Sequence, residues 1–159
     1  MDSKAGEKRS EPRLQRSLFP DPAQLGLVNM SRANTSAFVA LLEDVRPRWV
    51  MDLRVVPRFD FGVMNRRLFF ELFERLHIRY SDIAGLAGIS SHRDASLSSG
   101  AIVETLNTLL AEDPLPHAPG PILFLLKGTD SVAIAEQVIP PLLRPRPRGG
   151  WKIDTFDVQ

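Results

Sequence analysis

The 159-residue chain has no cysteine, only one tyrosine and two tryptophans, and no long uninterrupted apolar run. The missing cysteine excludes disulfide bonds, thiol nucleophiles and thiolate metal sites. No apolar stretch approaches the roughly 18 residues that a membrane-spanning helix needs. Residues 1–16 are charged and lack the apolar segment of a secretory signal. From these absences we expect a cytoplasmic protein that does not bind to membranes.

The remaining composition is ordinary for a soluble globular domain, with 43% apolar and 25% charged residues. The length predicts one compact domain with a short appendage at most. Residues 1–23 carry many charges and few large apolar side chains, so burial there would not offset the entropy cost of ordering them. We therefore predict a flexible charged N-terminal arm over 1–23 and an α/β domain over 24–157.

The basic residues are unevenly placed, although the net charge is only +1. Arginine supplies 16 of the 20 basic side chains. Residues 46–80 hold eight arginines against four acidic residues, whereas 81–142 hold two basic residues against seven acidic ones. Such segregation is typical of a polar binding face and equally of ordinary solvated helix faces. Both interpretations stay open from the sequence alone.

Short apolar runs alternate with amphipathic segments along the chain. Residues 122–126 are continuously apolar, as a central parallel strand should be. Asn34 and Asn65 can each cap a helix whose apolar residues recur at helical spacing. We predict a single three-layer α/β domain with a mostly parallel sheet and flanking helices. The expected strands are 25–30, 49–56, 77–80, 122–126 and an edge strand at 151–156, and the expected helices carry apolar faces over 38–45, 68–76, 102–110 and 132–139.

Polar side chains follow three of the expected strands. In an open parallel sheet, ligands bind beyond the carboxyl ends of the strands. The planar fork of arginine suits phosphate or carboxylate groups, so we predict a crevice for an anionic group. The alternative is that Asp52 and one arginine form a structural pair that ties a strand end to a neighbouring loop. The predicted ligand-binding residues are Ser31, Arg32, Asp52, Arg54, Arg58, Lys127 and Thr129.

Five short segments of the chain resemble, in their order, a bacterial family known only as domain of unknown function 488. The resemblance extends from about Leu25 to Leu143, roughly three quarters of the sequence. The five segments read Asn29-Met30-Ser31, Asp52-Leu53-Arg54, Pro57-Arg58, Ile78-Arg79-Tyr80 and Leu86-Ala87-Gly88. The resemblance implies an α/β fold with a parallel sheet and supplies no established reaction. That family commonly has Cys-His-Arg after its late apolar strand, where this chain has Lys127-Gly128-Thr129. If the family motif carries chemistry, this chain has lost much of it.

The chain has no strong catalytic signature. Glycine-rich phosphate-binding motifs are absent, and the three histidines show no metal-ligand spacing. We therefore predict no cofactor and no metal. Only Asp52 and His92 are weak catalytic candidates. The leading hypothesis is a catalytically reduced binding or partner-docking domain, and the alternative is a hydrolase or transferase acting on a nucleotide-like substrate.

Nucleic acid and a protein are two further candidate partners. Eight arginines between residues 46 and 79 would favour nucleic acid if they shared one face, but the pI of about 8.2 and the few free aromatic residues do not. The Arg-Pro segment over 144–148 has an extended geometry that suits docking to a protein partner, and it also suits a plain linker. We therefore expect a protein partner or a small anionic ligand in preference to nucleic acid.

Overall fold

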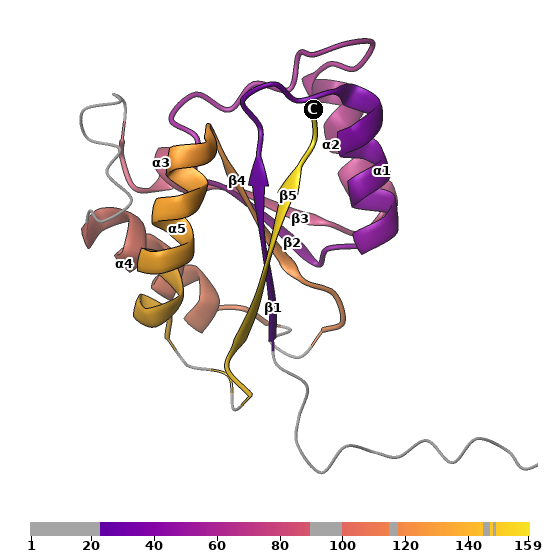
Figure 1. The fold of residues 1–159 in the computed structure, drawn as a ribbon. Coiled ribbons are helices and arrows are strands. Elements are labelled where there is room, and N and C mark those ends of the chain that lie inside the picture. The colour runs from indigo at the N-terminus through magenta and orange to yellow at the C-terminus, as the bar shows by residue number, and fades with distance from the viewer. Residues whose placement is uncertain (1–22, 90–99, 115–117, 145–146, 148) are drawn as a thin grey trace, which may run out of the picture.

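The computed structural model describes residues 23–89, 100–114, 118–144, 147 and 149–159. Their strands form one sheet of five parallel strands in the order β3-β2-β4-β1-β5 (Figure 1). The elements are β1 (Ala23–Asn29), α1 (Thr35–Val45), β2 (Trp49–Asp52), α2 (Arg66–Arg75), β3 (Arg79–Asp82), α3 (Ile83–Leu86), α4 (Gly100–Ala111), β4 (Ile122–Leu126), α5 (Thr129–Leu142) and β5 (Trp151–Asp157).

The helices cover both faces of the sheet. All five residues of β4 are buried, and successive side chains point to opposite faces. Leu123 and Leu125 belong to one apolar cluster with α1 and α2, while Phe124 belongs to a second cluster with α3, α4 and α5. Figure 1 shows these two groups of helices on opposite sides of the strands. The predicted three-layer α/β fold with a parallel sheet is confirmed.

Local sequence signals position α1 and α2, the two helices on one face of the sheet. The side chain of Asn34 accepts a hydrogen bond from the Ala37 N–H at the start of α1, and Asn65 does the same for the Leu68 N–H at the start of α2. Phe38 of α1 is fully buried against the ring of Phe69 from α2. Both caps and both apolar faces agree with the sequence-based prediction.

Two predicted strands have different bounds in the structure. β2 ends at Asp52 and does not continue to residue 56, because Arg54 turns back to hydrogen-bond the Asp52 side chain. β3 covers Arg79–Asp82 and not 77–80, because His77 adopts a left-handed conformation (φ 57°) that closes the end of α2.

The ends of the described fold lie close to the predicted limits of the domain. β1 begins at Ala23, and Val158 is buried in the core beyond the predicted end at 157. The short helix α3 has no counterpart among the expected elements, and Asp82 caps it by accepting a hydrogen bond from the Gly85 N–H. Residues 1–22, 90–99 and most of the Arg-Pro segment lie outside the described residues. No helix in the described part of the chain is long and apolar enough to cross a membrane.

Gly120 offers a test of the packing that precedes β4. Its φ is +103°, and a Cβ there would lie 2.5 Å from the backbone oxygen of Arg46. Gly88 also has a positive φ, but a Cβ there meets open space. We expect Gly88→Ala to cost about 1–2 kcal/mol of backbone strain, and Gly120→Ala to cost clearly more because it also displaces backbone. Urea denaturation measures the free energy of unfolding of both variants. Equal losses of unfolding free energy in the two variants would contradict the close packing of Gly120 against the Arg46 backbone.

Candidate functional site

The position of β4 in the sheet creates the candidate site. β4 lies between β1 and β2. The helices that follow β1 and β2 pack on one face of the sheet, and α5, which follows β4, packs on the other. Loops that leave neighbouring parallel strands toward opposite faces open a crevice at the carboxyl ends of those strands.

A cleft of about 730 Å³ occupies this position. That volume lies within the range of sites that take small molecules. The loop after β1 contributes Met30, Ser31, Arg32 and Ala33, and the loop after β2 contributes Leu53 to Val56, Arg58, Asp60 and Phe61. The end of β4 contributes Leu126, and the segment that follows it contributes Lys127 and Ser131.

Five of the seven predicted ligand-binding residues line the cleft. The structure brings together Ser31, Arg32, Arg54, Arg58 and Lys127 on its wall. Asp52 does not line the wall; it is fully buried beneath it. Thr129 is exposed at the first position of α5 and does not line the cleft either.

Asp52 and Arg54 form a buried ion pair at the base of the cleft. One carboxylate oxygen, Oδ1, accepts from the backbone N–H of Arg54 at 3.1 Å and from its Nε at 2.9 Å. The other, Oδ2, accepts from Arg54 Nη2 at 2.7 Å and from the Tyr80 hydroxyl at 2.9 Å. Every strong acceptor position of the carboxylate is thus occupied. This geometry matches the structural alternative for Asp52 that the sequence left open.

The same pair organises the loop after β2. Arg54 Nη1 donates to the Arg58 carbonyl at 3.1 Å, and the guanidinium lies 5.0 Å from the centre of the Phe59 ring. Phe59 is buried among aromatic rings of α2 and β3. The Thr35 hydroxyl donates to the Phe61 carbonyl at 2.6 Å and ties the loop to α1. The contacts of Arg54 and the hydrogen bond of Thr35 therefore fix the backbone of this loop at Arg58 and at Phe61.

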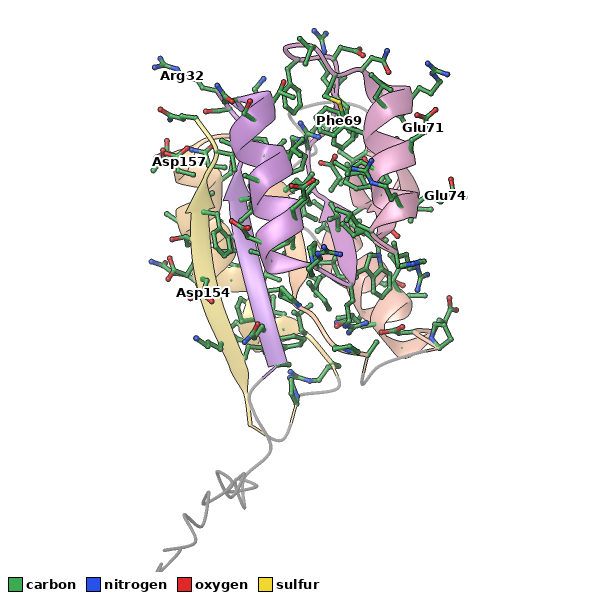
Figure 2. The ribbon with its side chains drawn as sticks, turned by 90° about the vertical axis from the view of Figure 1, so that its right-hand side faces the viewer. Arg32, Phe69, Glu71, Glu74, Asp154 and Asp157 are labelled. Carbon is green, nitrogen blue, oxygen red and sulfur yellow. The ribbon has the colours of Figure 1, made fainter. Side chains whose placement is uncertain are left out.

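Three cations of the cleft have no partner within the part of the chain that the structure describes. Among the described residues, the charged ends of Arg32, Arg58 and Lys127 make no hydrogen bond or ion pair, and all three side chains are exposed. Arg32 lies at the end of the molecule where β1 terminates (Figure 2). Asp60 is the carboxylate on the wall. Since Asp52 neutralises Arg54, three free cations face one carboxylate.

Asn29 sets the spacing between two loops of the cleft. Its Oδ1 accepts from the Ser31 N–H and from the Gly128 N–H, each at 3.1 Å, while the Met30 N–H donates to the Leu126 carbonyl. Gly128 is the N-cap residue of α5, with φ +98°, and provides no side-chain cap. The first N–H groups of this helix therefore lack a capping side chain beside Lys127, and such groups attract negative charge.

The sequence-based prediction missed Asn29, Asp60 and Ser131. In the sequence Asn29 belongs to one of the family-like segments, and a polar residue at the last position of an apolar strand is a usable signal. Asp60 and Ser131 reach the cleft from a long loop and from the first turn of α5. Their placement depends on loop paths that no local pattern encodes.

The eight arginines between residues 46 and 79 do not share one face. Arg48 precedes β2 and pairs with Asp113 at 2.6 Å, while Arg54 follows β2 and pairs with Asp52. Arg79 stacks over the Trp49 ring at 3.9 Å. Within the described ranges there is no cluster of three or more histidine and acidic side chains that could hold a metal ion. His92 lies outside the described residues.

Comparison with protein families, with curated proteins and with solved structures finds no match to this chain. The resemblance to domain of unknown function 488 therefore stays a prediction. Of the positions that carry it, Arg54 and Tyr80 both hydrogen-bond Asp52 in the structure.

Breaking the buried pair tests its structural role. Asp52→Asn leaves the Arg54 charge without a counterion, which costs about 3–5 kcal/mol of unfolding free energy for a buried pair. The matched control is Glu71→Gln, which removes the exposed Arg67–Glu71 pair and changes stability by less than about 1 kcal/mol. Chemical denaturation measures both variants. Similar small losses in the two variants would show that the Asp52 pair does not hold the fold.

Tyr80 gives a spectroscopic test of the same network. Burial, the nearby charge of Asp52 and the hydrogen bond to it raise the pKa of Tyr80 far above its ordinary value, and Arg54 opposes this only in part. Tyr80 is the only tyrosine, so tyrosinate absorbance reports it alone.

In the unfolded chain Tyr80 ionises near its ordinary pKa of about 10. Its contribution to stability is thus complete below that pH and is lost as the pH rises toward the raised folded value. We expect no tyrosinate signal from the folded protein around pH 10, and a signal that appears only together with unfolding. Ionisation of Tyr80 near pH 10 while circular dichroism stays native would contradict the hydrogen bond to Asp52.

Proposed function

We propose that this protein is a non-catalytic binding domain that takes the phosphate group of a small molecule in the cleft at the carboxyl ends of β1, β2 and β4. The observation that carries the proposal is the convergence of Arg32, Arg58 and Lys127 from three separate loops on one cleft. These loops are far apart in the sequence, and each cation is exposed without a partner among the described residues.

The chemistry of the wall favours a phosphate over a single carboxylate. A phosphate monoester has three acceptor oxygens and close to two negative charges at neutral pH. Two arginine forks and one lysine ammonium can each serve a different oxygen. The uncapped N–H groups at the start of α5 and the hydroxyls of Ser31 and Ser131 supply further donors. The excess of cations over Asp60 supports the same choice.

The remaining wall suits the organic part of such a ligand. Met30, Leu53, Val55, Val56 and Phe61 are apolar residues of the same cleft. Val56 is 56% exposed, which leaves apolar surface for a ligand to cover. A nucleoside or another partly apolar group attached to the phosphate would therefore find contacts here.

The geometry favours binding over catalysis. A hydrolase or transferase that uses Asp52 needs its carboxylate free to contact the substrate. Asp52 is fully buried, and Arg54 and Tyr80 occupy its oxygens. Releasing it would break a buried ion pair, which is strongly destabilising.

The proposal is tested by titrating the full chain with inorganic phosphate, a nucleoside monophosphate and a sugar phosphate in a calorimeter. Arg58→Ala and Lys127→Ala should each weaken the binding roughly 10- to 100-fold, the usual worth of a charged hydrogen bond. Arg67→Ala is the matched control, since Arg67 is an exposed arginine on α2 that pairs with Glu71 away from the cleft. It should leave binding unchanged.

Absence of heat and of any thermal stabilisation with all three compounds would overturn the proposal. An equal loss of affinity in Arg58→Ala and Arg67→Ala would also overturn it, because it would indicate unspecific attraction to the basic surface. Turnover of the nucleotide by the wild-type chain would instead favour the enzyme alternative.

A further inference from the structure

The strand β5 forms a long open edge of the sheet. It pairs with β1 on one side over all seven residues, from Trp151 to Asp157, and no described element pairs with its other side (Figure 1). Its outward backbone N–H and C=O groups are therefore available. The opposite edge strand, β3, has only four residues. An open strand edge is a template for pairing with another chain.

The side chains of β5 leave apolar surface incompletely covered. Trp151 and Ile153 pack against one core cluster and Phe156 against the other, yet each of the three stays partly exposed. Proteins commonly protect a lone edge strand with prolines, bulges, short length or charged side chains. Of these, β5 has only the charged side chains of Lys152, Asp154 and Asp157. β5 contains no proline and runs without a bulge in its register with β1.

The charges of β5 complement one another when two copies run antiparallel. Lys152 and Asp154 are two residues apart, so their side chains point to the same face of the sheet. Both are exposed, and neither has an ion-pair partner among the described residues. Figure 2 shows Asp154 midway along β5. In an antiparallel pair centred on Ile153, the lysine of each copy stands directly opposite Asp154 of the other copy.

We infer that β5 is a homodimerisation edge, at which two copies of this chain join their sheets antiparallel about Ile153. In this register Ile153 meets its own copy, Trp151 meets Thr155, and the two Lys152–Asp154 pairs flank the centre. The two-fold axis runs through the Ile153 pair, so the surface is self-complementary, as such a contact requires. An unrelated peptide strand would not in general carry charges that match both Lys152 and Asp154. The inference is independent of the proposed phosphate site.

The test is a charge exchange on the full chain, followed by sedimentation equilibrium. The wild-type protein should dimerise. Lys152→Asp and Asp154→Lys each turn two attractive cross-strand pairs into two repulsive ones, so each should raise the dimer dissociation constant about tenfold or more. The control Asp157→Lys lies on the same strand outside the paired span and should have little effect. Circular dichroism confirms that each exposed substitution leaves the fold intact.

Two restorations separate this arrangement from a general charge effect. An equal mixture of the Lys152→Asp and Asp154→Lys proteins pairs an acidic strand with a basic one and should form a heterodimer with affinity near the wild-type value. The double exchange in one chain should restore the homodimer. The inference would be overturned if the wild-type protein stays monomeric or if the mixture fails to associate. It would also be overturned if neither single substitution changes the dimer dissociation constant.

Discussion

The buried pair between Asp52 and Arg54 is the interaction on which the rest of the site depends. Removing two charges from water is costly, and the cost is offset here by two-point contact between guanidinium and carboxylate, by a backbone N–H and by the Tyr80 hydroxyl. The pair ends β2 and, through the Arg58 carbonyl, holds the following loop. It also removes one carboxylate and one arginine from the chemistry of the cleft. The other cations of the cleft, Arg32, Arg58 and Lys127, have no such carboxylate partner among the described residues.

The second constraint is the central place of β4. Because the helices after its two neighbours lie on the opposite face from α5, the strand ends separate and leave a cleft. Asn29 keeps that separation fixed, because its Oδ1 accepts hydrogen bonds from N–H groups of the loops after both β1 and β4. Sheet order, a buried amide and a buried ion pair together position Arg32, Arg58 and Lys127. The proposed phosphate site is a consequence of this arrangement and not of a local sequence motif.

Much of this could be predicted from the sequence, because apolar periodicity and helix caps act locally. The caps at Asn34 and Asn65 and the buried strand β4 are where the pattern places them. The cleft was predictable because polar residues follow parallel strands. The end of β2 was not, since nothing local distinguishes a strand that continues through Val56 from one that turns so that Arg54 can reach Asp52. Nor could sequence reasoning choose between Asp52 as a ligand contact and Asp52 as a structural partner. That choice depends on Tyr80, which is 28 residues away in the chain.

The most direct test of the account is an X-ray structure of crystals soaked in tungstate, an electron-dense analogue of phosphate. The account predicts one tungstate in the cleft within hydrogen-bond distance of Arg58 and Lys127, near the start of α5, with the Asp52–Arg54 pair intact. Tungstate bound to Arg54 with Asp52 displaced, or an empty cleft with tungstate ordered elsewhere on the surface, would contradict it.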